Sequence, residues 1–424
     1  MAGTKLRFLL KSIDVITRLG DDGLQLNGQK SYFYVKSKKG VLQLCKEQKG
    51  ALCNALCESK FAFNFNNLPC NIYVYEFCDL AILEIAFSSA SEITSFKLPA
   101  ALRSFVAANI TNDKNYETTQ LALFGNPSFK LDFASALKYA QNLSAFSLQS
   151  PGRISAYEGV KLVLIALFKL LSADITAFLK HKNDKSIAAL LNSLRQNAAI
   201  MQSFASLFDE HILDIFINAL NACIKALSEL SKKNYLCEYL QSQNIGKQKF
   251  AALERERSVL EDSCVLQVYE LQIKLKEWAY VLNDAEFFYS SPLGKEEIKS
   301  SLAPLLSDQL QGFLKLVNDA NYDALAQKIK ELFSLVSFFG SLYNANSFAK
   351  FAKKLAKINS DFEHISKCRF LNKAFDGPQM DGFKKELNES VKKTLKNIDK
   401  RANKLCKSSN KILELLKIYE NKGN

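Results

Sequence analysis

A stripe of lysines on the last predicted helix is the first group of residues whose spacing could do chemistry. Apolar residues recur every three or four positions from Phe383 to Leu405 and predict one buried face of a helix. Basic residues follow a second face at similar spacing: Lys396, Lys400, Lys404, Lys407 and Lys411. Aligned ammonium groups bind phosphate-rich polymers through many contacts that add up. The alternative, which stays open, is that these lysines only keep one face of the helix in water.

The charge of the whole chain also favours an anionic partner. Its 424 residues include 56 Lys and Arg against 43 Asp and Glu, a formal net charge of +13. Residues 351–424 hold eighteen of the basic residues and nine of the acidic ones, so +9 of the +13 lies there. Such an excess favours polyanions such as phosphate polymers, nucleic acid or anionic lipid, without choosing among them.

The residues that most enzymes use are scarce. The only histidines are His181, His211 and His364, which argues against a site built on several imidazoles. The sequence contains no Walker-type Gly-rich loop, no Ser/His/Asp set of plausible spacing and no zinc-finger pattern. One acid is suggestive: Glu84 lies in the apolar run Leu80–Phe87, where a buried carboxylate needs a partner such as a lysine.

The ten cysteines include no Cys-x-x-Cys pair, and as free thiols they fit a reducing compartment. A zinc site on Cys45, Cys53, Cys57 and Cys70 is conceivable, but buried free thiols that act as small apolar side chains are the favoured interpretation. The first twenty residues lack the apolar core of a secretory signal. The most apolar stretch, Leu162–Phe168, is shorter than the roughly 20 residues that span a bilayer. We therefore expect a cytoplasmic protein with no membrane span.

The elements that must position these residues change in character near residue 150. Before it, short alternating runs are separated by turn residues, as at Asn66–Pro69, and predict an antiparallel sheet or barrel. After Gly152, apolar residues recur three and four apart almost without interruption and predict a long helical bundle. We expect one domain over 1–127, a helical connector over 128–150, and a helical domain over 151–424 whose two halves divide near 241–255.

The segment Leu80–Gly125 resembles the closing part of CYTH domains, the triphosphate tunnel enzymes. In that family a strand with a Glu-x-Glu pair leads to a short helix, a proline and a Val-Thr-x-Asp-x-x-Tyr signature. Four positions match residue by residue: Thr111, Asp113 and Tyr116 in the signature, and Glu84 at the first glutamate. The resemblance covers about Lys5–Gly125 and implies an antiparallel β-barrel with a triphosphate-binding tunnel.

The opening motif of that family is changed in this chain. CYTH hydrolases begin with Glu-x-Glu-x-Lys, in which the acids hold a divalent metal and the lysine grips phosphate. Its slots fall on Gly3, Lys5 and Arg7, and the partner expected for Glu84 is Ala86. The candidate anion-binding residues implied here are Lys5, Arg7, Lys36, Lys46, Glu84 and Asp113. The alternative is that the four cations are solvated strand ends.

The helical half resembles a CHAD domain, which often follows a CYTH domain. That family repeats a helix of the type His-x-x-Arg followed by further arginines, whose basic groups face a phosphate polymer. Residues 188–204 take the first such position and residues 323–339 the second, where Asp323 stands in the histidine slot. The candidate polyanion-binding residues are Arg195, Lys328, Lys330, Lys353, Lys354, Lys396, Lys400 and Lys404.

Together these observations predict an α+β protein, with a CYTH-like antiparallel β-barrel followed by a CHAD-like all-helical bundle. The expected function is non-catalytic binding of inorganic polyphosphate or a similar polyanion, without a cofactor; nucleic acid stays open as a partner. One alternative is a metal-dependent inorganic triphosphatase that holds Mg²⁺ or Mn²⁺ at Glu84 and Asp113. A second is a structural adaptor that binds a protein through its helical surface.

Overall fold

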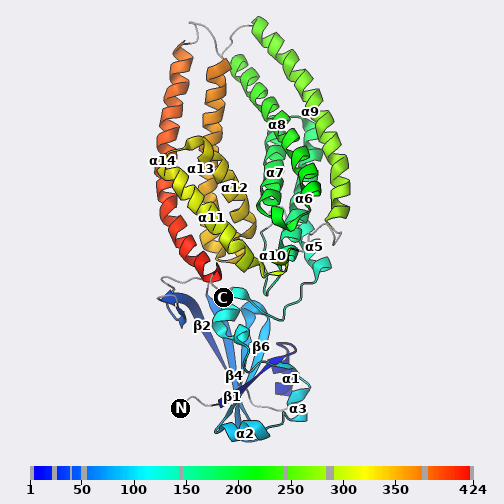
Figure 1. The fold of residues 1–424 in the computed structure, drawn as a ribbon, viewed down its shortest axis with the longest axis vertical. Coiled ribbons are helices and arrows are strands. Elements are labelled where there is room, and N and C mark those ends of the chain that lie inside the picture. Colours follow the sequence, from blue (N-terminus) through cyan, green and yellow to red (C-terminus); the bar gives the residue numbers. More distant parts are fainter. Residues whose placement is uncertain are drawn as a thin grey trace. The chain divides into compact units, whose positions relative to one another are not determined.

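The chain divides into two compact units in a computed structural model (Figure 1). The sheet unit comprises residues 1–131 and 149–154, and the helical unit comprises residues 132–148 and 155–424. The structure describes residues 4–21, 26–38, 41–48, 55–142, 147–242, 247–282, 291–374 and 381–420.

The sheet unit is built on seven antiparallel strands in the order β3-β2-β4-β5-β6-β1-β7. The strands are β1 (Thr4–Leu10), β2 (Asn27–Lys38), β3 (Val41–Cys45), β4 (Leu56–Phe65), β5 (Leu68–Tyr75), β6 (Leu80–Phe87) and β7 (Val106–Asn109). The two-residue turn between β4 and β5 is made by Asn66 and Asn67, whose φ values of 50° and 65° suit asparagine. The mixed α+β fold is therefore confirmed. Among the described residues, β3 and β7 are the edge strands and do not pair with each other, so the sheet is not closed into the barrel that we expected.

The two faces of the sheet differ in polarity. One face is mainly apolar: Phe8, Ile72 and Leu83 are buried there together with residues of three short helices. These helices are α1 (Val15–Asp21), α2 (Ala90–Ser95) and α3 (Ala100–Arg103). The opposite face is apolar at one end, where Tyr75 packs with Leu121 of α4 (Thr118–Phe124). Charged residues occupy the rest of it, and we call this side the polar face.

The helical unit contains two successive sets of four helices. After α5 (Phe133–Asn142), the first set is α6 (Ala156–His181), α7 (Asp184–Ser203), α8 (Glu210–Ser242) and α9 (Lys247–Val281). After α10 (Pro292–Lys295), the second set is α11 (Ile298–Asn318), α12 (Tyr322–Phe339), α13 (Ala345–Ala374) and α14 (Asp381–Glu420). A short 3₁₀ turn joins the second and third helix in each set: η3 (Ala205–Leu207) and η4 (Gly340–Leu342).

The division that we expected near 241–255 lies elsewhere in this arrangement. Residues 241–255 include the end of α8 and the start of α9, and both helices belong to the first set. The polar run there connects two helices of one set, whereas the second set begins after α9. Polar composition identifies a turn, but it does not show whether the turn separates two bundles.

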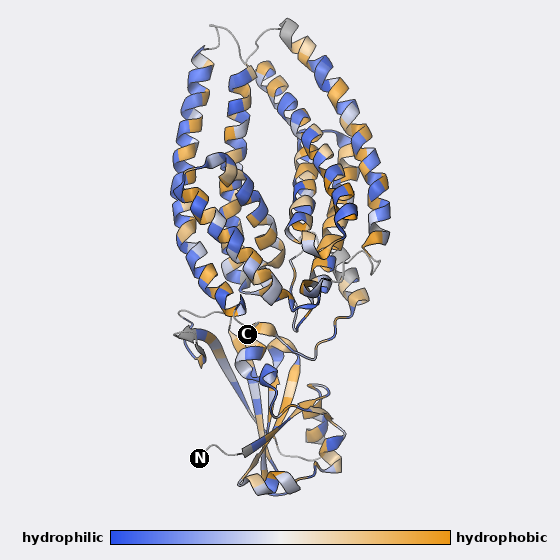
Figure 2. Ribbon diagram, in the orientation of Figure 1, coloured by the Kyte–Doolittle hydropathy of each residue, from blue (hydrophilic) through white to orange (hydrophobic). Residues whose placement is uncertain are grey.

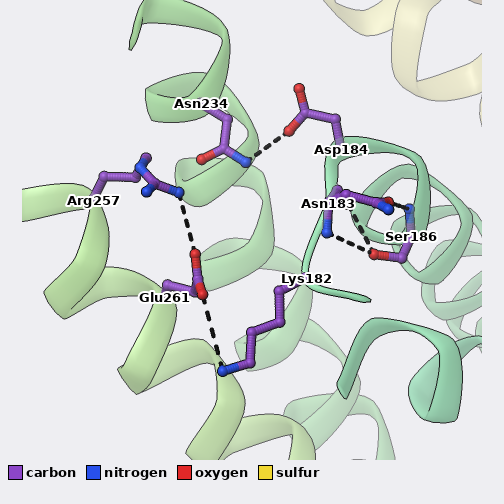
Figure 3. Close-up of polar contacts among 7 residues, drawn as sticks. All are labelled: Lys182, Asn183, Asp184, Ser186, Asn234, Arg257 and Glu261. Atoms are coloured by element: carbon purple, nitrogen blue, oxygen red, sulfur yellow. Dashed lines mark hydrogen bonds and ion pairs between the residues drawn. The ribbon is translucent and has the colours of Figure 1, made fainter. Parts of the chain in front are cut away.

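The turn between α6 and α7 shows how polar residues fix the helices of one set (Figure 3). Lys182 ends α6 in the left-handed conformation, and Asn183 caps the first turn of α7. Asp184 accepts a hydrogen bond of 2.6 Å from Asn234 of α8, and Lys182 lies 4.0 Å from Glu261 of α9. The turn between α6 and α7 is thereby tied to α8 and to α9.

The long helices show hydrophobic and hydrophilic residues in bands along their length (Figure 2). By length and composition alone, α6 and α8 could each cross a membrane. The core helix of a bundle passes the same test, and α6 buries Val163, Leu167 and Leu171 inside the helical unit. The absence of a membrane span therefore stays a prediction.

The single tryptophan provides a test of the core of the first set. Trp278 of α9 is fully buried, and its ring centroid lies 5.6 Å from that of Phe168 and 4.0 Å from that of Phe216. We expect Trp278→Ala to lower the free energy of unfolding by about 3–5 kcal/mol, because it leaves a cavity. Urea unfolding followed by circular dichroism measures this change. The exposed Ile215 is the control, since Ile215→Ala should cost less than about 1 kcal/mol.

Candidate anion-binding sites

Strand register brings three of the predicted residues together on the polar face. Arg7 of β1 lies opposite Glu84 of β6, and Lys5 lies opposite Ala86. Alternate residues of a strand point to the same side of the sheet, so Lys5 and Arg7 share a face with Glu84. The predicted cations of β1 therefore meet the predicted acid of β6.

The Lys5 ammonium neutralises the buried acid. Lys5 Nζ lies 2.8 Å from Glu84 Oε1, and the exposed fraction of the side chain is 48 % for Lys5 and 11 % for Glu84. A buried carboxylate needs such a partner, because removal from water disfavours its charge. The lysine that we expected beside Glu84 is thus Lys5, and its charge is already balanced within the sheet.

Arg7 holds the segment that carries the CYTH-like signature. Its Nη2 donates a hydrogen bond of 2.9 Å to the carbonyl oxygen of Tyr116, and its backbone N–H donates one of 3.0 Å to Thr111 Oγ1. These contacts span more than a hundred residues of sequence. Arg7 therefore positions residues 111–116 against β1.

Two strands that carry no predicted anion-binding residue extend this charged group. The polar face continues onto β4 and β5, where the Lys60 Nζ lies 5.7 Å from the centroid of the Tyr73 ring. Burial, and after it the charge of Glu84, raises the pKa of Tyr73 to about 12. Burial also raises the pKa of Glu58, against a hydrogen bond with Tyr75 and the charge of Lys60. The alternation of charged residues along β4 is the sequence pattern that could have revealed this part of the polar face.

The other predicted residues of the sheet unit lie apart from this group. Strand pairing from Glu84 through Asn71 of β5 and then β4 shows which residues of β2 lie on the polar face. Lys36 points to the opposite side of β2. Lys36 Nζ lies 3.5 Å from Glu47 Oε2, and Lys46 is exposed just after β3. The structure does not bring these two lysines to the polar face.

Asp113 lines an open pocket of about 840 Å³ together with Lys5 and Thr111. Its carboxylate accepts a hydrogen bond of 2.9 Å from the backbone N–H of Asn115, so it caps the turn η2 (Lys114–Tyr116). Glu84 is paired with Lys5, and divalent cations of this kind want several oxygen ligands. Over the described part of the chain, no three His, Cys, Asp or Glu side chains form a metal-binding group. These residues therefore do not fit Mg²⁺ or Mn²⁺, and Cys53 of the conceivable zinc site lies outside the described residues.

The helical unit brings two other predicted cations together where its two sets meet. Arg195 of α7 and Lys330 of α12 occupy equivalent places, each ten residues before the 3₁₀ turn of its set. The helices α7 and α12 pack against each other (Figure 1). Burial lowers the pKa of both cations, and the charge of Arg195 lowers that of Lys330 further. We call these two residues the central cation pair.

Acidic groups compensate the central cation pair only in part. Arg195 Nη2 donates a hydrogen bond of 3.3 Å to Ser228 Oγ of α8. The equivalent position of α13 is Glu363, because each lies eighteen residues after the start of its helix. Glu363 opposes the lowering of both pKa values. One carboxylate thus serves two half-buried cations, and within the described residues neither cation forms a salt bridge, which leaves a net positive charge.

The remaining candidates of the helical unit are on its surface or already paired. Lys328 donates hydrogen bonds to Gln309 (2.9 Å) and Glu331 (3.2 Å), and Lys354 donates one of 2.9 Å to Ser408. The exposed candidates on α13 and α14 are Lys353, Lys396, Lys400 and Lys404. The three on α14 follow one another at four-residue spacing on its surface, whereas Arg195 and Lys330 are a half-buried pair.

Comparisons with known proteins show only distant likenesses. No protein-family model matches the sequence, and no curated protein matches it. The CHAD domain from the plant Ricinus communis is similar in structure at 11 % identity and a TM-score of 0.46, covering 65 % of this chain and 95 % of that one. The inorganic triphosphatase NE1496 aligns at 12 % identity and a TM-score of 0.23, covering 29 % of this chain and 95 % of that one. PptA from Streptomyces chartreusis aligns at 13 % identity and a TM-score of 0.33, covering 59 % of this chain and 97 % of that one.

All three TM-scores are below 0.5. The functional conclusions therefore rest on the side chains of this protein, above all on the paired charges of the polar face and the partly compensated central cation pair.

The raised pKa of Tyr73 predicts how stability changes in alkaline solution. An unfolded tyrosine ionises near pH 10, whereas burial keeps the folded Tyr73 protonated up to about pH 12. Its contribution to stability is therefore complete below about pH 10 and is lost as the pH rises towards 12. Tyr73→Phe should lose less stability than the wild-type chain over this range in urea unfolding. The exposed Tyr32 is the control: Tyr32→Phe should keep the wild-type slope, and an unchanged slope for Tyr73→Phe would contradict the prediction.

Proposed function

We propose that this protein is a non-catalytic binder of inorganic polyphosphate or a similar polyanion, and that the helical unit holds the ligand. The observation that carries the proposal is the central cation pair, two half-buried cations that share one carboxylate. Burial without full compensation disfavours a charge, and an anion with several phosphate groups would supply the missing partner. The exposed lysines of α14 would supply a second, separate set of contacts to a long polymer.

The polar face of the sheet unit supports this assignment, because its two predicted cations on β1 are already engaged. Lys5 is engaged by Glu84, and Arg7 is engaged by the Tyr116 carbonyl. A ligand anion on the polar face would have to compete with these contacts. Within the described residues, neither member of the central cation pair forms a salt bridge that a ligand would have to displace.

The proposal predicts the effect of removing the central cation pair. Arg195→Ala/Lys330→Ala should weaken binding of long-chain polyphosphate about tenfold or more, because each charged contact contributes about 1.5–3 kcal/mol. Isothermal titration at low salt measures the affinity, and circular dichroism verifies the fold. Lys225 is exposed on α8, outside both candidate sites, so Lys225→Ala/Lys232→Ala removes the same charge as a control and should change affinity less than about threefold.

Salt and a competing polymer separate the remaining possibilities. Polyanion binding should weaken steeply between low salt and about 0.5 M salt, because ions are released on binding. Unchanged affinity of the double variant would contradict the assignment to the central cation pair. Stronger binding of single-stranded DNA than of polyphosphate would make nucleic acid the partner.

Hydrolysis of triphosphate is the less supported alternative, because Glu84 is paired with Lys5 and the residues do not fit a divalent cation. We expect no phosphate release from inorganic triphosphate above background with Mg²⁺ or Mn²⁺. A colorimetric phosphate assay checks this, and Glu84→Gln is the matched variant. Release that depends on the metal and disappears in Glu84→Gln would establish the enzyme instead.

We also propose a cytoplasmic location. The cysteines that the structure describes are all free thiols, as expected in a reducing compartment.

A further inference from the structure

The outer face of α9 carries an unusual row of exposed apolar residues. Val259, Leu266, Ile273 and Tyr280 follow one another at intervals of seven, and their exposed fractions are 71, 66, 61 and 81 %. Tyr269, 49 % exposed, lies three residues after Leu266. A seven-residue repeat with a second position three further on is the pattern by which two helices pair. The row is about 32 Å long at 1.5 Å per residue, and we call it the apolar row.

The apolar row is not the face by which α9 packs in its own bundle. That packing uses the opposite side of the helix, where the following residues are buried: Cys264, Val268, Leu271, Leu275, Trp278 and Leu282. The helix therefore carries apolar residues on two sides, and its own fold covers only one of them.

The equivalent helix of the second set shows that the fold does not require these apolar residues. Shifting each buried position of α9 by 134 residues gives a buried position of α14: Ile398, Ala402, Leu405, Ser409, Ile412 and Leu416. The same shift places Lys393, Lys400 and Lys407, all exposed, at the slots of Val259, Leu266 and Ile273. One helix has charged residues, with Glu414 at the slot of Tyr280, where the other has large apolar side chains, so the fold does not require apolar residues there.

Charge along the apolar row is arranged for a second copy of this chain. Asp262 and Lys276 are both exposed, and each lies seven residues from Tyr269 on the same side of the helix. In an antiparallel pair centred near Tyr269, Asp262 of each helix faces Lys276 of the other. Leu266 then lies beside Ile273, and Val259 beside Tyr280. A twofold interface requires this self-complementarity.

We propose that the protein self-associates through antiparallel pairing of α9 with α9 of a second copy. The interface is one helix face about 32 Å long, which is smaller than the roughly 800 Å² per partner of a standard interface. The dimer is accordingly weak, with a dissociation constant on the order of 10 µM. This surface is separate from the central cation pair and does not depend on the proposed ligand.

Sedimentation equilibrium of the full chain between about 1 and 100 µM tests the proposal. The wild-type chain should shift from monomer to dimer with concentration, and Leu266→Lys/Ile273→Lys should remain monomeric. That variant should keep its fold, because α14 carries lysines at these slots, and it should keep its affinity for polyphosphate. Ile215→Lys is the control, an exposed apolar residue of α8 that should leave the dimer unchanged.

Charge reversal tests the antiparallel direction. Asp262→Lys alone should weaken the dimer about tenfold or more, since it places two lysines together. Asp262→Lys/Lys276→Asp should restore the dimer to within about threefold, because the opposite charges meet again. In a parallel pair Asp262 would face Asp262, so Asp262→Lys would exchange one like-charge pair for another and leave the dimer unchanged. That result, or a double reversal without rescue, would overturn the antiparallel arrangement. A wild-type chain that stays monomeric at 100 µM would overturn self-association and leave the row to a helix of another protein.

Discussion

The burial of one apolar side of every long helix is the constraint on which the helical unit depends. It is met twice, by two sets of four helices that use the same order and the same 3₁₀ turn. The buried positions of α9 recur in α14 after a fixed interval. Because α7 and α12 lie where the sets meet, Arg195 and Lys330 are drawn out of water together. The candidate ligand site is thus a consequence of how two bundles share an inner surface.

The polar face of the sheet was predictable where alternation within one strand decides it. Two cations spaced by one residue had to share a face, and an acid in an apolar strand had to find a cation. Lys60 and Tyr73 were missed because their place beside Glu84 depends on the pairing of β4, β5 and β6. The prediction of a closed barrel was wrong for a similar reason. Strand composition predicts that strands pair, but it does not determine whether the two edge strands meet.

The helical unit was predictable in class but not in its internal symmetry. Three- and four-residue spacing identified the helices, whereas the equivalence of Arg195 and Lys330 became visible only once the 3₁₀ turns aligned the two sets. The apolar row of α9 could not be recognised from the sequence, because the helix has apolar residues on its buried side as well. A helix with apolar residues on two opposite sides has little amphipathic contrast, so its pattern does not reveal which side is covered.

The correspondence between α9 and α14 shows which outer positions of this kind of helix accept different residue types. One outer slot, for example, holds Leu266 in α9 and Lys400 in α14, on helices whose buried positions correspond. Substitutions at these slots are therefore decoupled from the core. The surface chemistry of one set of helices can therefore differ from that of the other without a change in the packing of either core.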